Sequence, residues 1–577
     1  MALVHRVTTN FPSLLSNYYC KCVVNIKICR WKSYAHQQST LNNDTNIAKE
    51  KKISFDEMLN FRRNQANKSI LIQVNSLNCG IECTNYCHKF GKIAHVFHYT
   101  IQMERQHFML VEFELQESVR YMKNSIGYVQ NHEYVPVETS ILLYRNIMAT
   151  PQRSREQSVK STDVQVHSFS IPNLKQIEIN MLTATNIAEQ MTRLHRMLRI
   201  TELEKRLRFY TAQQLELCFS KLFPTLTIVP FGSSVNGFGQ VGCDLDLLCK
   251  LKDENNKDRT LKKLLFQTKS FSINERDDQK EFLTTLSNII HNFVPGVCNM
   301  QKILEARVPI LKFFNKHTNM WCDLSSTNMI ALYMSELLFF YGELDWRVKP
   351  LVCTIRKWAR YNNITSEIPG HWITNFSLTL LIIFYLQHKL LLPPINVIKK
   401  QIPESPSTKI SNRQLVASLK TNPSTKSENV DTLDVLLLDF FKYYSTFDFG
   451  THGICIRQGT KKIKRNCAPL YIFNPFEPMM NVSRNVNWNE IISLRRNITN
   501  ALEILERNEN NSVLPLLGIT SNKDMQMHKL RNYDDPNIVQ KNNNNDVDLK
   551  SSESVHDELL TNEGSLDDSN KLEERIK

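Results

Sequence analysis

The sequence predicts an α+β protein in which a central α/β domain is preceded by a small βαββα module and followed by a helical domain. Three observations carry this prediction. Runs rich in β-forming residues alternate with two helical stretches over residues 69–124. Further strand-like runs lie within residues 226–325, and helical periodicity dominates residues 344–392. The order of these segments therefore indicates three structural parts.

The bulk composition fits two or three domains, because the chain has 577 residues, of which 42% are hydrophobic. Its 71 Lys and Arg residues exceed its 57 acidic residues, which suits a polyanionic partner without identifying one. The 14 cysteines are scattered, which favours reduced thiols in an intracellular compartment. No apolar run reaches the roughly 18 residues of a membrane span. The longest candidate, Leu378–Leu386, predicts a buried core helix.

The first 43 residues contain no acidic residue, since the first one is Asp44. Five basic residues lie among Ser and Thr residues in this stretch: Arg6, Lys21, Lys27, Arg30 and Lys32. This composition is typical of an organellar transit peptide, whereas a secretory signal needs a compact apolar run before a small-residue cleavage site. We expect a transit peptide over residues 1–43, with a disordered basic arm as the alternative.

The N-terminal module is predicted to contain strands at Ser69–Val74, Ile93–His98 and Phe108–Phe113, with helices near Ile81–His88 and Ser118–Asn124. The order strand, helix, strand, strand, helix resembles an RNA-recognition fold. That fold stacks bases on aromatic side chains of its central strands. Base recognition by this module would therefore require aromatic residues on its central strands.

The residues expected to stack bases are missing from the module. Leu110 stands where an aromatic residue is expected, and Ile70–Gln73 contains none. The Lys/Arg-Gly start of the RNA-binding signature is absent before Phe108. A protein-contact role is therefore at least as well supported as base recognition.

Cys79, Cys83 and Cys87 repeat every four residues and precede His88. They could form a metal cluster. Helical spacing without a second ligand pair instead favours the buried face of a helix.

The strongest chemical signal begins at Phe231-Gly232-Ser233, after a strand predicted over Leu226–Pro230. Glycine at this position lets backbone amides approach a phosphate closely, and Ser233 adds a hydroxyl donor. This loop indicates a phosphate-binding site more specifically when a pair of carboxylates follows it.

That pair is Asp244 and Asp246, ten residues further along the chain. On a strand the two side chains project to one face, while Leu245 turns to the core. Neighbouring carboxylates repel each other unless a cation lies between them, and Mg²⁺ prefers such oxygen ligands. The pair therefore predicts a site for a divalent metal.

Asp323 is the candidate for a third carboxylate. It lies on a strand predicted over Met320–Ser325, which returns after a strand over Val308–Phe314 and a turn at His317–Asn319. Cys322 is expected to face the other way. A third acidic ligand would allow a second metal and would receive the proton of an attacking hydroxyl.

These residues resemble the signature of the polymerase β-type nucleotidyltransferases. Further motifs resemble the noncanonical poly(A) polymerases, and most closely the mitochondrial members of that family. The matching segments are Asp345–Val352, Arg356–Arg360, Thr374–Leu380, Asn474–Pro478 and Asn481–Val486. The resemblance covers about residues 68–507.

The resemblance implies which residues form the site. Asp244, Asp246 and Asp323 would be the catalytic and metal-binding residues. The nucleotide would be held by the other matching positions: Phe231, Gly232, Ser233, Arg356, Arg360, Asn375, Phe376, Glu477, Asn481 and Arg484. Phe376 would stack on the adenine base. Relatives that prefer UTP often place His before the Asn of this loop, and Met480 in that position favours ATP.

The resemblance also implies a reaction and a setting. AMP from ATP would be added to RNA 3′ ends without a template, by a two-metal mechanism using Mg²⁺ or Mn²⁺. The enzyme would act on mitochondrial transcripts in the matrix, as a homodimer. A terminal uridylyltransferase with the same site, a non-catalytic RNA-binding or dimerising scaffold, and a 2′-5′ oligoadenylate synthetase-like enzyme are the alternatives.

The domain boundaries follow from these assignments. Helical periodicity runs from about 186 to 222, and residues 403–427 are polar enough for a surface loop. The expected parts are a transit peptide (1–43), the RNA-recognition-like module (55–148), a linker (149–185), a helical segment (186–224), the nucleotidyltransferase palm (225–341), a central and PAP-associated domain (342–510) and a disordered tail (521–577).

Overall fold

The computed structural model describes residues 53–76, 79–101, 105–127, 139, 141–144, 164–168, 172–251, 275–326, 328–366, 368, 370–400, 427–507 and 511–519. The expected transit peptide and the expected disordered tail lie outside these residues. So do the polar stretch 149–162 and all but the last residue of the loop expected over 403–427.

The N-terminal module has the predicted βαββα order, with three further elements. Its helices are α1 (Phe55–Asn67), α2 (Cys79–His88) and α3 (Gln116–Asn124), and its strands are β1 (Ser69–Val74), β2 (Ile93–Ile101), β3 (Gln106–Phe113), β4 (Ile141–Leu143) and β5 (Val164–Ser168). The sheet order is β4-β1-β3-β2-β5. Ser54 caps α1 through a capping box with Glu57. Cys83 and Cys87 are fully buried under the sheet, as the helix-face prediction required.

The expected linker over 149–185 is corrected in its second half. Residues 164–168 form β5, which pairs in parallel with β2 of the module. Residues Leu174–Leu182 form α4, whose Asn173 cap accepts a hydrogen bond from the Gln176 amide. Ile177 and Met181 of α4 are buried in the core of the helical domain, and this packing holds the helix in place.

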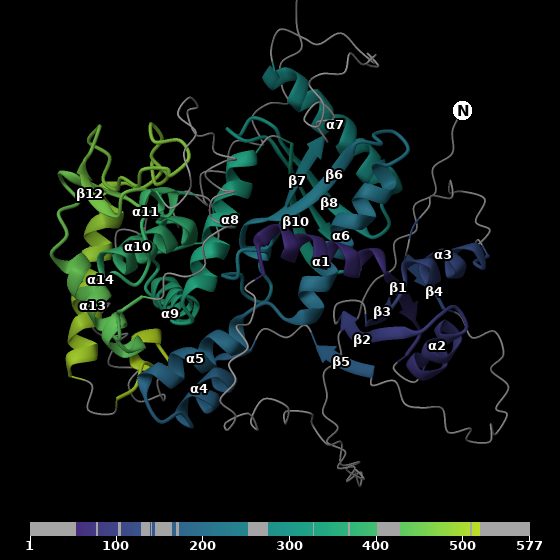
Figure 1. Ribbon diagram of the computed structural model, residues 1–577, viewed down its shortest axis with the longest axis horizontal. Coiled ribbons are helices and arrows are strands. Elements are labelled where there is room, and N and C mark those ends of the chain that lie inside the picture. The colour runs from purple at the N-terminus through teal and green to yellow at the C-terminus, as the bar shows by residue number, and fades with distance from the viewer. Residues whose placement is uncertain are drawn as a thin grey trace, which may run out of the picture. The chain divides into compact units, whose positions relative to one another are not determined.

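The domain expected to be the palm, called the catalytic domain below, contains a five-stranded sheet in the order β6-β7-β10-β9-β8. Its strands are β6 (Leu226–Phe231), β7 (Leu245–Leu251), β8 (Val297–Ile303), β9 (Ile310–Asn315) and β10 (Met320–Ser325), of which β6, β7, β8 and β10 are labelled in Figure 1. β7 and β10 are parallel, and the other pairs are antiparallel. Leu245 and Cys322 are fully buried with apolar residues of α6 (Glu202–Phe219) and of α7 (Glu275–Phe293), as their strand positions predicted.

The helix expected over residues 186–222 is two helices, α5 (Ile187–Leu198) and α6 (Glu202–Phe219). The break follows from local chemistry, because Thr201 begins α6 with a capping box to Glu204. The two helices serve different cores. Leu194 of α5 lies in the helical domain, whereas Leu215 of α6 packs beneath the catalytic sheet.

The helices of the helical domain pack around one large apolar core. Its helices are α8 (Met329–Leu344), α9 (Val348–Tyr361), α10 (Asn375–His388), α11 (Ile395–Lys400), α13 (Leu433–Ser445) and α14 (Trp488–Glu506), with a hairpin of β11 (His452–Cys455) and β12 (Thr460–Ile463). The region 344–392, predicted to be helical, contains the last residue of α8, all of α9 and all of α10, which are separated at 345–347 and 362–374. Residues 377–387 of α10 are all buried, which confirms the predicted core helix. In the described parts of the chain, no helix is long and apolar enough to cross a membrane.

The module docks on α6 through the sheet face that an RNA-recognition fold uses for bases. Tyr99, Phe108 and Leu110 are fully buried there with Leu207 and Tyr210 of α6. The Tyr210 hydroxyl accepts a hydrogen bond from the Leu71 amide of β1 at 3.0 Å. This face is therefore covered by the chain itself, in line with the predicted protein-contact role.

Candidate active site

Strand register brings the chemically important residues of the catalytic sheet into one row. Phe231 on β6 pairs with Asp246 on β7, and Asp246 pairs with Asp323 on β10. Asp323 in turn pairs with Lys312 on β9. Asp244 lies just before β7, so it can reach the same face as Asp246. The two segments that carry the predicted carboxylates are thus neighbouring strands.

Lys312 is the functional residue that the sequence interpretation missed. Its Nζ lies 2.9 Å from Asp244 Oδ2 and 3.1 Å from Asp323 Oδ1. Burial lowers the pKa of Lys312, but the hydrogen bond to Asp244 and the charge of Asp323 raise it more, so the amine is held protonated. Position 312 lies on the predicted strand Val308–Phe314, but a three-residue turn at His317–Asn319 would pair it with position 324, whereas its observed partner is Asp323.

The carboxylates repel one another despite this lysine. The pKa of Asp246 is raised to about 7, chiefly by burial and then by the charges of Asp323 and Asp244. Burial also raises the pKa of Asp323, although Lys312 opposes the shift. Such a site favours any additional cation that can lie between the oxygens.

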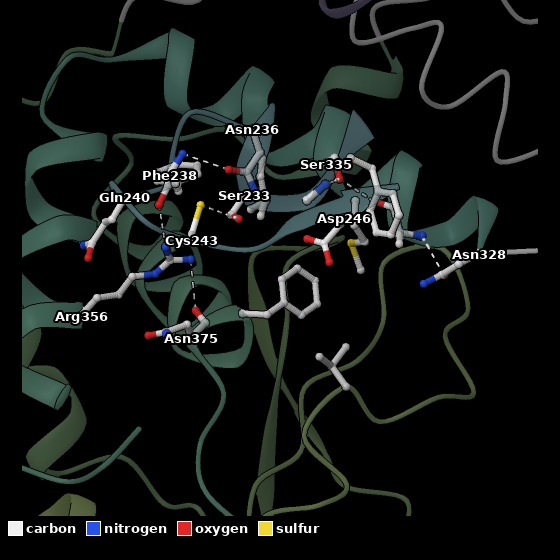
Figure 2. Close-up of a pocket in the computed structure, with 18 of the residues that line it drawn as sticks. Ser233, Asn236, Phe238, Gln240, Cys243, Asp246, Asn328, Ser335, Arg356 and Asn375 are labelled. Carbon is white, nitrogen blue, oxygen red and sulfur yellow. Dashed lines mark hydrogen bonds between the residues drawn. The ribbon is translucent and has the colours of Figure 1, made fainter. Parts of the chain in front are cut away.

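Gly232 needs to be glycine for two reasons. Its φ of +66° lies in the left-handed region, and a Cβ atom there would collide with the Asp246 carboxylate. Its amide donates to Ser335 Oγ of α8 at 2.7 Å, which ties this turn to the helical domain. The neighbouring Ser233 hydroxyl donates to Cys243 Sγ at 3.4 Å (Figure 2).

Arg208 of α6 fixes the turn that precedes Asp244, and it too was missed. Its guanidinium is fully buried, and it donates to the Cys243 carbonyl at 2.7 Å and to the Asp244 carbonyl at 3.3 Å. Its charge also lowers the pKa of Asp246 against the larger effect of burial. A residue 36 positions from Asp244 gives no local sequence signal of this role.

The β9–β10 turn is held from the module. The Tyr99 hydroxyl donates to the His317 carbonyl at 2.7 Å, and the Phe108 ring lies 5.5 Å from the His317 ring. Because this turn joins the strands of Lys312 and Asp323, the docked module stabilises the carboxylate row from outside the catalytic domain.

A cavity of about 960 Å³ opens beside Asp246 between the catalytic sheet and the helical domain. It is lined by all the predicted nucleotide-binding residues: Phe231, Gly232, Ser233, Arg356, Arg360, Asn375, Phe376, Glu477, Asn481 and Arg484. Of the predicted catalytic residues, Asp246 lines it, whereas Asp244 and Asp323 join the site through Lys312. Residues from β6, α9, α10 and the loop before α14 thus meet at one cavity.

Arg356 connects the two walls of this cavity. It donates to the Phe238 carbonyl at 2.8 Å and to Thr379 Oγ1 at 2.6 Å, and it reaches the Asn375 carbonyl at 3.3 Å (Figure 2). Burial lowers its pKa to about 10. Most of its donors are therefore engaged within the protein, and Lys357 and Arg360 are further cations that line the cavity.

Asn481 organises the loop before α14. Its side-chain oxygen accepts from the amides of Ile472 and Ser483, both at 3.0 Å, and its amide donates to the Leu470 carbonyl at 2.8 Å. Met480 precedes it and lines the cavity, with its sulfur 3.3 Å from the Arg307 guanidinium. Asn481 thus positions the loop, while Met480 offers an adaptable surface.

The segments that form this site are similar to known protein families. Residues 187–343 match the family described as poly(A) RNA polymerase, mitochondrial-like, central palm domain. Residues 432–479 match the Cid1 family poly A polymerase domain. Two similar proteins are the mitochondrial poly(A) RNA polymerases of Drosophila melanogaster and Homo sapiens. The first is 35% identical, covering 80% of this chain and 77% of the relative; the second is also 35% identical, covering 76% and 74%.

A crystal structure of mtPAP in complex with ATPγS is similar over 81% of this chain and 99% of that one. Its TM-score is 0.72 at 30% identity. A crystal structure of mtPAP in complex with UTP matches over the same shares with a TM-score of 0.71. The similarity spans both the catalytic sheet and the helical domain.

Proposed function

The chain belongs to the family of mitochondrial poly(A) RNA polymerases, and from that premise we propose which of its residues carry the reaction. It is a mitochondrial polynucleotide adenylyltransferase that adds AMP from ATP to RNA 3′ ends. The observation that carries the proposal is the strand register that aligns Asp246 with Asp323 beside the nucleotide cavity. We assign catalysis to these two residues together with Asp244.

We assign Mg²⁺ or Mn²⁺ to this carboxylate cluster. The donors are oxygens alone, which suits hard divalent ions. In the described part of the chain, no three Asp, Glu, His or Cys side chains are placed so that they could hold a metal ion together without rearrangement. Lys312 Nζ lies between two of the carboxylates, Asp244 and Asp323. When bound, a pair of such ions would lower the pKa of the RNA 3′-hydroxyl and stabilise the leaving pyrophosphate.

The remaining residues would hold and orient the substrates. Phe376 would stack against the adenine, and Arg360 and Arg484 would face the triphosphate as charge partners. Gly232 and Ser233 would approach the phosphates from the opposite wall. Arg356 would act mainly by joining the walls, because its donors are already used.

Lys312 is expected to compete with metal for the carboxylates. Replacing it with Met should tighten Mn²⁺ binding on the order of tenfold, about 1.4 kcal/mol, because the internal cation is lost. The apoprotein should also melt earlier, since the carboxylates then repel one another without compensation. Mn²⁺ titration by electron paramagnetic resonance and thermal melts in chelator would measure both effects.

The control is Lys302→Met, an exposed lysine on the edge strand β8 of the same sheet. It should change neither quantity. Weaker Mn²⁺ binding in Lys312→Met, or no Mn²⁺ binding by the wild-type protein, would contradict the assignment of the metal site.

Met480 is expected to influence nucleotide choice. A Met480→His substitution should raise kcat/KM for UTP relative to ATP, because imidazole narrows the cavity and offers a polar partner to a pyrimidine carbonyl. Met479→His is the matched control, since Met479 is 77% exposed and does not line the cavity. Because mtPAP crystal structures hold ATPγS or UTP, binding alone is a poor readout. If the ratio of kcat/KM for UTP to kcat/KM for ATP is the same in both variants, Met480 does not influence nucleotide choice.

We also propose that two copies of the chain associate, as the resemblance implies. Light scattering on the intact chain should give twice the mass of 67.3 kDa. Deleting the module is a poor test, because it would uncover the apolar residues that pack on α6. A mass that stays at one copy across dilution would contradict the proposal.

A further inference from the structure

The β11–β12 hairpin carries a concentration of positive charge that the catalytic site does not use. Residues 452–468 contain five Lys and Arg residues and no acidic residue. Four of the five lie on β12 or just after it: Lys461, Lys462, Lys464 and Arg465. We refer to these four residues as the basic hairpin (β12 is labelled in Figure 1).

The cations of the basic hairpin have no carboxylate partner within the described residues. Three of them lie near aromatic rings instead: Lys462 and Arg465 are each 5.8 Å from the Phe473 ring, and Lys464 is 5.3 Å from the Trp488 ring. Lys464 also donates to the Ala468 carbonyl at 2.6 Å and lies within the electrostatic reach of Asp448, and Arg465 contacts the Met479 sulfur. Four cations within five positions, without a carboxylate in ion-pair contact, favour a ligand that carries several negative charges.

An exposed aromatic residue lies beside these cations. Trp488 at the start of α14 is 47% exposed, so its ring can receive a further stacking partner. A positive surface combined with an exposed aromatic ring fits single-stranded nucleic acid, whose bases stack while its phosphates contact the cations.

Backbone hydrogen bonds connect the hairpin to the wall of the nucleotide cavity. The Phe473 amide donates to the Ile454 carbonyl of β11 at 3.0 Å, and the Asn474 amide donates to the Met480 carbonyl at 3.1 Å. Asn474, Met480 and Asn481 all line the cavity. The basic hairpin is therefore continuous with the rim of the site where the RNA 3′ end reacts.

The sheet face of the RNA-recognition-like module is not open to a strand. It is buried against α6, with Tyr99, Phe108 and Leu110 fully covered. This face of the module therefore does not compete with the basic hairpin for RNA.

We propose that the basic hairpin and Trp488 hold the backbone and a base of single-stranded RNA upstream of the reacting 3′ end. This proposal rests on the proposed function, because it names the surface that presents RNA to the same site. The four cations contact phosphates and set affinity rather than sequence preference. Trp488 stacks on whichever base lies next to it.

The test uses the full chain and a labelled, unstructured RNA of roughly twenty nucleotides, longer than the roughly 4–16 nucleotides of one single-strand module. The variant combines Lys461→Gln, Lys462→Gln, Lys464→Gln and Arg465→Gln. The control removes four exposed lysines elsewhere: Lys175→Gln, Lys221→Gln, Lys302→Gln and Lys442→Gln. Fluorescence anisotropy without ATP and with chelator measures Kd between about 50 and 200 mM salt.

The hairpin variant should bind RNA about ten- to a hundredfold more weakly at the lower salt concentration, whereas the control should change little. The slope of log K against log salt should fall by roughly 0.7 for each lost phosphate contact, or about 3 in all. The KM for ATP with a very short primer should stay unchanged. Trp488→Ala should weaken binding about tenfold without changing the slope.

Lys461→Gln with Arg465→Gln provides a second variant, because both side chains are exposed and their loss should leave the fold intact. Unchanged RNA affinity, or equal losses in the hairpin and control sets, would overturn the proposal. So would a loss of self-association without a loss of RNA affinity, which would assign the surface to a second copy of the chain. Since no metal or ATP is present, these outcomes are independent of the assigned carboxylates.

Discussion

Replacing Asp246 with asparagine is expected to abolish nucleotide addition while making the apoprotein more stable. Asn keeps the size of the side chain but removes a charge that Asp244 and Asp323 repel. Loss of a metal-binding carboxylate should remove several kcal/mol of transition-state stabilisation, on the order of a 10³-fold fall in kcat. Opposite changes in activity and stability from one substitution would distinguish a functional carboxylate from a structural one.

The stability gain should depend on pH. The folded pKa of Asp246, about 7, lies above its ordinary value of 3.8, so folding favours the protonated form. Wild type therefore has no penalty below about pH 4, loses stability as pH rises, and carries the full penalty above about pH 7. A shift of about three units corresponds to roughly 4 kcal/mol, and residual solvent contact should reduce it to about 2 kcal/mol.

Thermal melts in chelator at a series of pH values would measure this difference. The Tm of Asp246→Asn should equal that of wild type near pH 4 and exceed it increasingly up to about pH 7. Leu248→Met on the same strand is a suitable control, because it alters the shape of a buried side chain while nearly conserving volume and leaving charge unchanged. A constant Tm difference across this range would show that charge repulsion at Asp246 is not the cause.

Replacing Arg206 with methionine is expected to cause the largest loss of stability. Its Nε lies 2.9 Å from Glu112 Oε2 on β3, and the two side chains are only 8% and 7% exposed. Its guanidinium also lies 4.8 Å from the Phe97 ring. Removing one partner leaves a buried, unpaired charge, which costs about 3–5 kcal/mol. Urea unfolding of the full chain would measure the change.

The double variant Arg206→Met with Glu112→Met is the decisive control. It removes both charges together, so most of the lost stability should return. A cost below about 1 kcal/mol for Arg206→Met, the range of exposed ion pairs, would contradict the docking of the module on α6. A double variant as unstable as the single one would show that packing, rather than the unpaired charge, dominates.

The sequence was most informative where local patterns decide structure. The strand Met320–Ser325 has the predicted bounds, and Cys322 and Asp323 face opposite sides as alternation requires. The helical stretch expected over 186–222 is divided into two helices, because periodicity alone does not reveal a capping residue such as Thr201. Long-range contacts could not be predicted from the sequence for a related reason. Arg208 acts on a turn far away in the sequence, so nothing near it signals its partner.

Apart from Gly232 and Ser233, the predicted residues of the nucleotide cavity came from resemblance rather than from spacing. Phe231, Phe376 and Asn481 are far apart in the chain, and their meeting depends on how the helical domain packs against the catalytic sheet. Lys312 marks the intermediate case. Its strand and the following turn were predicted, but the predicted turn would place it one residue away from Asp323, so the exact pairing comes from the observed register.

We propose that three carboxylates carry out AMP addition: Asp246 and Asp323 on neighbouring strands, and Asp244 just before the strand of Asp246. The most direct measurement extends a labelled RNA with each nucleotide triphosphate separately, using wild type beside Asp323→Ala at equal concentration and equal folded fraction. Wild type should form a ladder with ATP and Mg²⁺, and Asp323→Ala should add no nucleotide while retaining its RNA affinity. Appreciable Mg²⁺-dependent extension by Asp323→Ala would contradict the account.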